Sequence, residues 1–301
     1  MIALAQIPLR IWRQRSQIFM FRGHAIRYWV AGQGEPLLLI HGFPTASWDW
    51  HYLWQPLAQR YRVIACDMLG FGDSAKPTDH VYSLLEQADL QQALLAHLNV
   101  RGALHVLAHD YGDSVAQELL ARHYEARIHL ASCVFLNGGL FPETHRPVWA
   151  QKLLLSPLGW LLGRAFSRES LVSSFRQIFG PRTTPTESEL DDFWSLVEAH
   201  RGPRIMHKLI AYIPERCVQR DRWVQAMQRG DVPLRVIDGA VDPISGEHMV
   251  ARYEALIPNP DTVLLPDIGH YPHTEAPVQV LKHYLAFREA IAAPRRQMAC
   301  S

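Results

Sequence analysis

The amino-acid sequence predicts an α/β fold, in which an eight-stranded, mostly parallel sheet is flanked by helices and a helical cap is inserted after the sixth strand. Two observations support this prediction. Short β-rich apolar runs recur between longer segments in which apolar residues return every three or four positions, a pattern typical of strands linked by crossover helices. This alternation stops between residues 138 and 232, where all patterns are helix-sized.

The strands and helices of the core follow from these two patterns. The short apolar runs predict strands over residues 17–21, 25–30, 36–40, 62–66, 103–108, 130–136, 234–238 and 262–265. The three-to-four-residue periodicity predicts helices over residues 46–59, 84–98, 112–123, 247–256 and 277–291.

The segment 138–232 is rich in Trp, Leu, Phe and Arg and is broken at Gly180-Pro181 and Gly202-Pro203. Thr186 and Glu189 form a capping box, which marks the start of one helix. At 301 residues, the chain is long enough for one α/β domain with an insertion. We therefore expect a core domain built from residues 1–137 and 233–301, and a helical cap domain built from residues 138–232.

The chain is balanced in charge. It has 30 lysines and arginines against 29 aspartates and glutamates, and a net charge of +1 gives no reason to expect nucleic acid or an anionic membrane as a partner. The apolar start of the chain is too short to span a bilayer, so we expect no firm membrane anchor. The cysteines are far apart and form no CxxC pair, which favours reduced thiols in a cytoplasmic protein; they are Cys66, Cys133, Cys217 and Cys300.

One stretch combines a predicted strand, a sharp turn and a predicted helix in direct succession. The apolar run ALHVLA leads into HDYGD and then into SVAQELLARH, which places Asp110 at the apex of the turn. Ala108 and Gly112, two positions to either side, are small, as such a tight turn requires. A carboxylate at this apex attacks an electrophile without the help of a base and forms an ester.

Two other interpretations of this turn exist. The run from Gly112 to Ala116 has the spacing of a serine elbow, but Ser114 lies several residues past the strand, within the first turn of the helix. Asp110 also suits a helix N-cap, where aspartate is favoured and interacts well with the helix dipole. The turn alone leaves this second interpretation open.

Two later turns supply partners for Asp110. VIDGAVDP places Asp242 after one late strand, and LLPDIGHYPHTEAP places His270 after the next. We expect Asp242 to orient the imidazole and His270 to activate the water that cleaves the ester. Taken singly, Asp242 fits an ordinary turn residue and His270 an ordinary loop histidine. The order of nucleophile, acid and histidine, each at the carboxyl end of a strand, favours a triad.

The turn HGFP after the third predicted strand is the candidate oxyanion site. The backbone N–H groups of Phe43 and Tyr111 would face the developing negative charge. We expect His41 and Pro44 to shape the turn, and His109 to be a packing residue beside the nucleophile.

Several motifs resemble the epoxide hydrolase and haloalkane dehalogenase branch of the α/β-hydrolases. They are HGFPTASWDW, DMLGFGDSAKP, AHDYGDSVAQELL and IGHYPHTEAP, and the likeness runs across nearly the whole chain. Within the expected cap, NGGLFPETHRP and FGPRTTPTESEL are similar to the mesoderm-specific transcript group. The resemblance implies an α/β-hydrolase fold without a cofactor, and a triad of Asp110, Asp242 and His270.

The resemblance leaves the substrate open. An epoxide needs a proton donor for its leaving alkoxide, and epoxide hydrolases supply one with two cap tyrosines. Tyr212 lies roughly where these enzymes carry the second tyrosine, but residues 138–232 contain no other tyrosine. A packing role fits Tyr212 about equally well. Either one phenol suffices, or His145 or His207 is the second donor, or the substrate is a strained lactone or an ester.

A halide leaving group needs hydrogen-bond donors but no proton. Dehalogenases of this branch typically use a tryptophan after the nucleophile and a second Trp or an Asn, whereas Tyr111 and Phe43 hold those positions here. A dehalogenase would therefore depend on a tryptophan of the cap, of which there are four: Trp149, Trp160, Trp194 and Trp223.

The sequence thus predicts an epoxide hydrolase that forms vicinal diols through an ester on Asp110. A haloalkane dehalogenase and a hydrolase of strained lactones or esters are the alternatives, and a non-catalytic binding protein is a distant one, because such proteins usually lose a triad member. We expect a small apolar electrophile and water as partners, and a monomer or homodimer. We expect no metal, because the sixteen histidines include no HExxH or comparable pair.

Overall fold

The computed structural model describes residues 4–293 and contains a single eight-stranded sheet. The strand order is β1-β2-β4-β3-β5-β6-β7-β8; β2 pairs antiparallel with β1 and β4, and all other pairs are parallel. This confirms the predicted fold class. The strands are β1 (Gln17–Phe21), β2 (His24–Ala31), β3 (Pro36–Ile40), β4 (Arg62–Cys66), β5 (Leu104–His109), β6 (Leu130–Leu136), β7 (Leu234–Gly239) and β8 (Thr262–Leu265).

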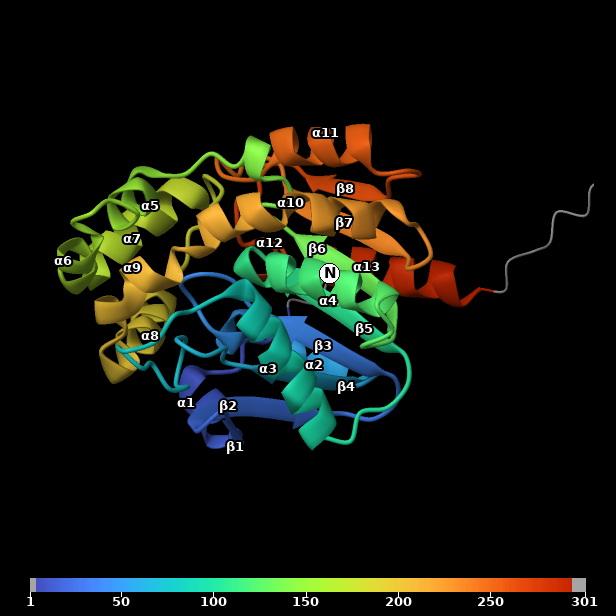
Figure 1. The fold of residues 1–301 in the computed structure, drawn as a ribbon, viewed down its shortest axis with the longest axis horizontal. Helices are drawn as coiled ribbons and strands as arrows, with labels where there is room; N and C mark the ends of the chain where they lie inside the picture. The colour runs from blue at the N-terminus through green and yellow to red at the C-terminus, as the bar shows by residue number, and fades with distance from the viewer. Residues whose placement is uncertain (1–3, 294–301) are drawn as a thin grey trace, which may run out of the picture.

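Helices cover both faces of the sheet (Figure 1). Those outside the segment between β6 and β7 are α1 (Leu9–Gln14), η1 (Ser47–Trp50), α2 (Trp54–Ala58), α3 (Leu84–His97), α4 (Tyr111–Tyr124), α11 (Glu247–Leu256), α12 (Pro272–Glu275) and α13 (Pro277–Ala292). Those between β6 and β7 are η2 (Pro142–Thr144), α5 (Trp149–Leu154), α6 (Gly159–Arg164), α7 (Arg168–Ile178), α8 (Glu187–Glu198), η3 (Ala199–Ile205), α9 (Met206–Leu209) and α10 (Tyr212–Gln228).

Alternate residues of the strands pack into two separate apolar cores. In β3, Leu38 and Ile40 join one core, which also contains residues of α3, α4, α10 and α11, while Leu37 and Leu39 join the other, with residues of α1, α2 and α13. This two-sided burial explains why the parallel strands are nearly continuous apolar runs.

Residues 138–232, which we call the helical insertion, contain only helices and loops. Helices α5 to α9 lie together at one end of the sheet, on the left in Figure 1, whereas α10 packs on α4. The predicted capping box is present, because the Glu189 N–H donates to Thr186 Oγ1 (3.3 Å) and the Thr186 N–H donates to Glu189 Oε2 (2.9 Å). That the insertion forms a separate cap domain stays a prediction.

The single helix predicted over residues 46–59 is wrong. The structure has the short 3₁₀ helix η1 and then α2, and Pro56 explains part of the break, because it lacks the N–H that a helix continuing from residue 52 would need. The side chain and N–H of Ser47 are also both bonded to Asp67 Oδ1 (2.5 and 2.9 Å), which fixes the start of η1 by tertiary contacts.

The start of the chain packs on the core. In α1, Trp12 is buried, stacks on Trp29 (5.0 Å between ring centroids) and donates to Ser47 Oγ (3.3 Å). This helix was not among those predicted from the sequence, because it is only six residues long. Cys300 lies outside the described residues, whereas the other three cysteines are free thiols.

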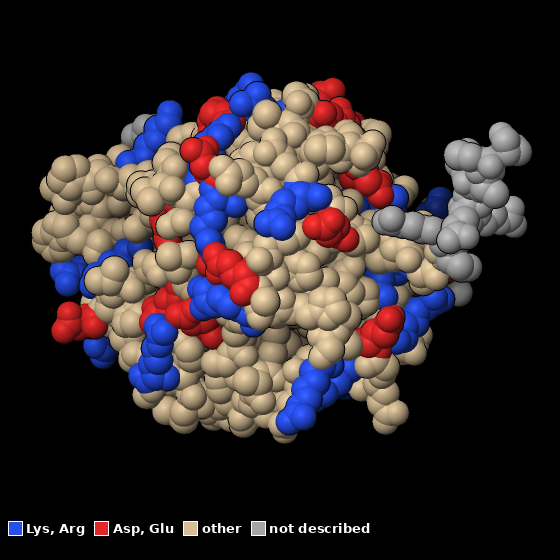
Figure 2. Space-filling model, turned by 45° about the vertical axis from the view of Figure 1, so that its right-hand side comes forward, with Lys and Arg blue, Asp and Glu red and all other residues tan. Residues whose placement is uncertain are grey.

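The surface mixes both signs of charge. Figure 2 shows lysines and arginines interspersed with aspartates and glutamates on the face it displays. None of the helices in residues 4–293 has the length and apolar character of a membrane span.

Candidate active site

Asp110 lies between the end of β5 and the first residue of α4, in a strained backbone conformation with φ 47° and ψ −105°. A non-glycine residue with positive φ is uncommon and marks a position that its surroundings hold in place. The neighbouring turn must be free of side chains, because a Cβ at Gly112 would lie 2.5 Å from the Ile40 carbonyl oxygen. Asp110 occupies the N-cap position of α4, but its side chain makes no cap hydrogen bond to the helix.

The HGFP turn after β3 contacts the Asp110 carboxylate directly. The Phe43 N–H donates to Asp110 Oδ2 (3.0 Å). His41 is fully buried and ties the turn together, since its Nδ1 bonds the Gly42 carbonyl (2.8 Å) and its Nε2 accepts from the Met68 N–H (3.0 Å). Burial lowers the pKa of His41 to about 4, so this imidazole is neutral.

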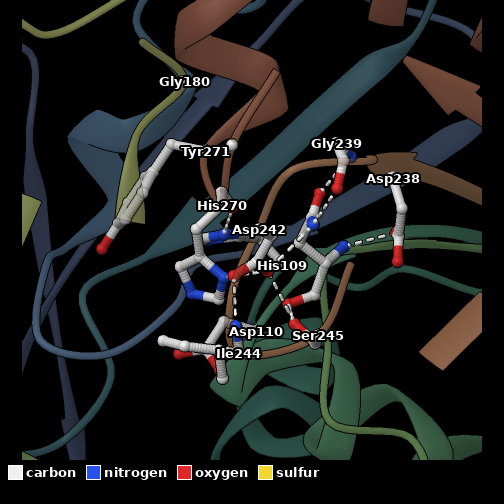
Figure 3. A network of polar contacts seen from close by, with 12 residues as sticks. His109, Asp110, Gly180, Asp238, Gly239, Asp242, Ile244, Ser245, His270 and Tyr271 are labelled. Atoms are coloured by element: carbon white, nitrogen blue, oxygen red, sulfur yellow. Dashed lines mark hydrogen bonds and ion pairs between the residues drawn. The ribbon is translucent and has the colours of Figure 1, made fainter. Parts of the chain in front are cut away.

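Asp242 and His270 form a close pair at the ends of β7 and β8 (Figure 3). His270 Nδ1 lies 2.7 Å from Asp242 Oδ2. The same carboxylate accepts hydrogen bonds from the Ile244 N–H (2.8 Å), from Ser245 Oγ (2.9 Å) and from Asn137 Nδ2 (2.9 Å). Although burial alone would raise the pKa of Asp242, the charge of His270 and these bonds hold it below its usual value.

The charge of His270 depends on both carboxylates. Burial disfavours the imidazolium, but Asp242 and then Asp110 outweigh it and raise the pKa of His270 to about 9. Burial likewise opposes ionisation of Asp110, yet His270 and Arg216 hold the pKa of that carboxyl below its usual value. The resting site is therefore an ionised Asp110 beside a protonated His270. Because Nδ1 is bonded to Asp242, Nε2 is the nitrogen left for proton transfer.

Asn137, which the sequence analysis missed, connects the ends of β6 and β7. Its N–H donates to Asp238 Oδ1 (2.6 Å), and its side chain bonds both the N–H and the carbonyl of Gly239 (2.7 and 3.1 Å) as well as Asp242. Its φ of 43° marks the turn where β6 ends. The signal was available in the sequence, because Asn137-Gly138-Gly139 directly follows a predicted strand, and Asp110 and Asp242 also lie within a few residues of a strand end.

Arg216 of α10 is the second residue that the sequence analysis missed. Its Nη2 lies 3.5 Å from Asp110 Oδ1 and donates to the Asp110 backbone carbonyl (2.9 Å). Its Nε donates to Ser114 Oγ (2.6 Å). Nothing in the sequence separates it from the other arginines of the same helix, Arg220 and Arg222, which form ion pairs with Glu143 and Glu118.

A cavity of about 50 Å³ lies against Asp110 and His270. Its lining is mostly apolar and is shared by the turns of the sheet and the helical insertion. The turns contribute Phe43, Pro44, Asp110, Ile244 and His270, and the insertion contributes Val148, Gln151, Leu154, Phe166, Leu171, Ser174, Phe175, Ile178 and Met206.

Tyr212 begins α10 and does not itself line this cavity, but it contacts residues that do. Its side chain is buried, and its hydroxyl accepts a hydrogen bond from Gln151 Nε2 (3.2 Å), which itself lines the cavity. Its ring packs against Phe43 and Tyr111, with centroids 5.7 and 5.1 Å away. Burial and then the charge of Asp110 raise the pKa of Tyr212 far above its usual value, so the phenol keeps its proton.

The other candidate donors are placed differently. His145 has two buried ring nitrogens with no hydrogen-bond partner in the described part of the chain, and burial followed by Arg216 lowers its pKa to about 4. Trp160 is 47% exposed, and the indole N–H of Trp223 is bonded to Glu118 Oε2 (3.0 Å). Neither these residues nor His207 and Trp194 line the cavity. The side chain of Trp149 lies outside the described residues.

Ser114 is buried in the first turn of α4 and does not line the cavity. Its hydroxyl accepts from Arg216 Nε. This environment argues against the serine-elbow alternative.

A second polar cluster lies beneath the HGFP turn. Asp49, His109 and His273 are buried and offer ligand atoms that all lie within 4.8 Å of one another, a grouping that could hold a metal ion. His109 Nε2 bonds the His270 carbonyl (2.8 Å), and since a carbonyl only accepts, this nitrogen carries the proton. Sequence spacing could not reveal the cluster, because its members come from three distant elements, η1, β5 and α12.

Known proteins with similar sequences span almost the same length. Mesoderm-specific transcript protein of Mus musculus is 40% identical over 295 residues, which cover 93% of this chain and 87% of that protein. Putative hydrolase LipZ of Mycobacterium tuberculosis is 40% identical over 250 residues, or 82% of this chain and 85% of that protein. Cis-3-alkyl-4-alkyloxetan-2-one decarboxylase of Shewanella oneidensis is 27% identical over 288 residues, or 90% of this chain and 88% of that protein.

Solved structures agree on the fold. The haloalkane dehalogenase DatA from Agrobacterium tumefaciens superimposes with a TM-score of 0.78 at 19% identity and covers 92% of this chain and 96% of its own. Epoxide hydrolase CorEH superimposes with a TM-score of 0.75 at 20% identity and covers 92% of this chain and 99% of its own. Residues 35–277 match the family described as alpha/beta hydrolase fold. The chain belongs to the α/β-hydrolase fold family and resembles its epoxide hydrolase and haloalkane dehalogenase branch.

Proposed function

We propose that this chain is a hydrolase that attacks a small apolar electrophile with Asp110 and forms a covalent ester. The observation that carries the proposal is that Asp110 and His270 line one cavity, with Asp110 Oδ2 held by the Phe43 N–H and His270 held by Asp242. Since Oδ2 is fixed, Oδ1 is the oxygen that attacks. Ionised Asp110 needs no base for this step.

An epoxide is the first substrate class. Asp110 Oδ1 bonds to a ring carbon, the C–O bond of that carbon breaks, and the alkoxide takes the phenolic proton of Tyr212. The protonated His270 releases a proton and Tyr212 regains one, so His270 is neutral once the ester has formed. Tyr212 supports this class because its oxygen accepts from Gln151, which leaves its own O–H free to donate.

Hydrolysis of the ester restores the starting state. Water attacks Cγ of Asp110 and gives a proton to His270, while the Phe43 N–H bonds the developing oxyanion at Oδ2. The tetrahedral intermediate expels the alcohol oxygen, which takes the second proton of the attacking water. Asp110 is then again a carboxylate, His270 is again protonated, and the product is a vicinal diol.

A strained lactone is the second candidate. Attack of Asp110 on the ring carbon next to the lactone oxygen expels a carboxylate, which needs no proton. His270 therefore releases its proton to solvent before it acts as the base in hydrolysis. Such a leaving group suits a cavity that no tyrosine of the described residues lines. The relative from Shewanella oneidensis is named for an oxetan-2-one, a four-membered lactone. A halide has less support, because none of the tryptophans whose side chains the structure describes lines the cavity.

The test is a panel of styrene oxide, β-butyrolactone and 1-bromobutane with wild type and His270→Gln, followed by intact-mass spectrometry. We expect wild type to turn over styrene oxide and His270→Gln to gain one substrate mass on Asp110, because only hydrolysis needs the base. The proposed mechanism is wrong if wild type turns over a substrate but His270→Gln never gains the adduct. Stoichiometric labelling of wild type without turnover would instead indicate a binding protein.

A further inference from the structure

Arg216 brings a buried positive charge from the helical insertion to the nucleophile. Its side chain is 2% exposed, and that of Asp110 is 5% exposed. Within the described residues, Asp110 is the only carboxylate partner of Arg216 closer than 4 Å. The guanidinium also lies 4.5 Å from the ring centroid of Tyr212, so it contacts both the nucleophile and the proposed proton donor.

The position of the guanidinium is fixed on several sides. Nε is bonded to Ser114 and Nη2 to the Asp110 carbonyl, so two contacts hold it to the strained turn itself. Gly139 makes room for it, because a Cβ there would lie 2.4 Å from Nη1. Among the side chains that the structure describes, Nη1 is buried and has no hydrogen-bond partner, a cost that packing alone does not explain.

We propose that Arg216 is a further catalytic residue, which pairs with Asp110 Oδ1 and promotes hydrolysis of the ester on Asp110 more than its formation. This inference rests on the proposed function of Asp110 as nucleophile. It names a residue that the triad does not include and that comes from the insertion rather than from the edge of the sheet.

The reason is how charge changes at Asp110 along the reaction. The carboxylate starts ionised and becomes neutral in the ester, so a cation beside it stabilises the reactant of alkylation. In hydrolysis the order is reversed, because the neutral ester passes through a tetrahedral anion and ends as a carboxylate. A fixed cation therefore stabilises the transition state of hydrolysis more than the ester.

The same change of charge bears on the base. Once Asp110 is esterified, His270 loses one of the negative charges that favour its protonated form. This loss favours neutral His270, which is the form that accepts a proton from water.

The experiment measures the two half-reactions separately in Arg216→Met, which removes the charge and keeps a long apolar side chain. Single-turnover quench and intact-mass spectrometry with styrene oxide and β-butyrolactone give the rates of ester formation and decay. We expect ester decay to slow about ten- to hundredfold, less than for a direct oxyanion-hole donor because the contact is 3.5 Å long, and ester formation to change less than about threefold at pH 8. The acid limb of ester formation should move to higher pH, because Asp110 loses a nearby cation.

Two further variants keep the test decisive. Gly139→Ala retains the guanidinium but displaces its flexible end, and should also slow decay selectively; it decides the matter if circular dichroism shows that Arg216→Met does not fold. Arg222→Met, on the same helix, removes the ion pair with Glu118 (2.9 Å) and should leave the ratio of the two rates unchanged.

Equal slowing of both half-reactions in Arg216→Met and Gly139→Ala would overturn the inference, because a purely structural role predicts it. An altered ratio in Arg222→Met to the same extent would also overturn it. Absence of any ester in wild type and in His270→Gln is a different result, since it removes the proposed function itself.

Discussion

The carboxyl-end edge of the sheet, which is the edge formed by the carboxyl ends of its parallel strands, and the helical insertion contribute to the candidate site in different ways. The edge supplies Asp110, Asp242 and His270, and both oxygens of Asp242 are bonded to neighbouring protein groups. The insertion supplies most of the cavity wall, nearly all of it apolar, with Gln151 as its main polar contact. Under the proposed function, the edge fixes the covalent chemistry, whereas the insertion selects the electrophile and provides its proton.

Replacement of the nucleophile should have the largest effect and tests the role of the edge. Asp110→Asn keeps the shape of the side chain and removes the charge, which matters because Asp110 is only 4% exposed rather than on an open surface. We expect turnover to fall at least about 10⁴-fold, since loss of a nucleophile removes the covalent route. Steady-state kinetics measures this, with circular dichroism as the check on folding. Retention of more than about a hundredth of the activity would contradict the assignment.

The insertion is tested by Tyr212→Phe, which removes one oxygen from a buried side chain. We expect epoxide opening to slow about 10- to 10⁴-fold, the usual range for loss of a general acid, and lactone opening to be unaffected. Single-turnover alkylation measures both. Tyr253→Phe, a change at a buried tyrosine of α11 that packs on Phe141, is the matched control and should alter neither rate. If Tyr212→Phe opens epoxides as fast as wild type, Tyr212 is a packing residue.

The edge was also easier to predict from the sequence than the insertion. Strand, turn and helix follow one another within a few residues around Asp110, so the local pattern placed this residue at an apex. Asp242 and His270 each follow a strand, and parallel strands place their carboxyl ends along one edge. Asn137 follows the same rule but lacks a charge, and for that reason it was overlooked.

Contacts that cross between distant segments could not be predicted in this way. The pairing of Arg216 with Asp110 joins residues 106 positions apart, and α10 carries other arginines with the same local pattern. The cluster of Asp49, His109 and His273 also joins three elements that are distant in the sequence, η1, β5 and α12. The split of the helix predicted over residues 46–59 likewise depends on bonds between Ser47 and Asp67, which periodicity does not contain.

The smallest expected effect is on stability and concerns the edge alone. The pKa of His270 is raised from 6.5 to about 9 in the folded protein, so its contribution to the free energy of unfolding is complete below pH 6.5 and is lost as pH rises through about 9. The lowered pKa of Asp242 has the opposite dependence, and its contribution is lost only as pH falls below 3.8. Between pH 6.5 and 9.5, loss of the His270 contribution should therefore dominate the difference in free energy of unfolding between wild type and a variant without this imidazole.

Urea unfolding at several pH values measures this difference, with His270→Gln as the variant. Between pH 6.5 and 9.5, we expect the free energy of unfolding of wild type to fall by on the order of 3 kcal/mol more than that of His270→Gln, because each unit of pKa shift corresponds to about 1.4 kcal/mol. His129→Gln, at an exposed histidine outside the cavity, should follow wild type. Parallel curves for wild type and His270→Gln would mean that the two carboxylates do not hold a proton on His270 at neutral pH. The charge changes proposed for the ester on Asp110 would then need a different starting state.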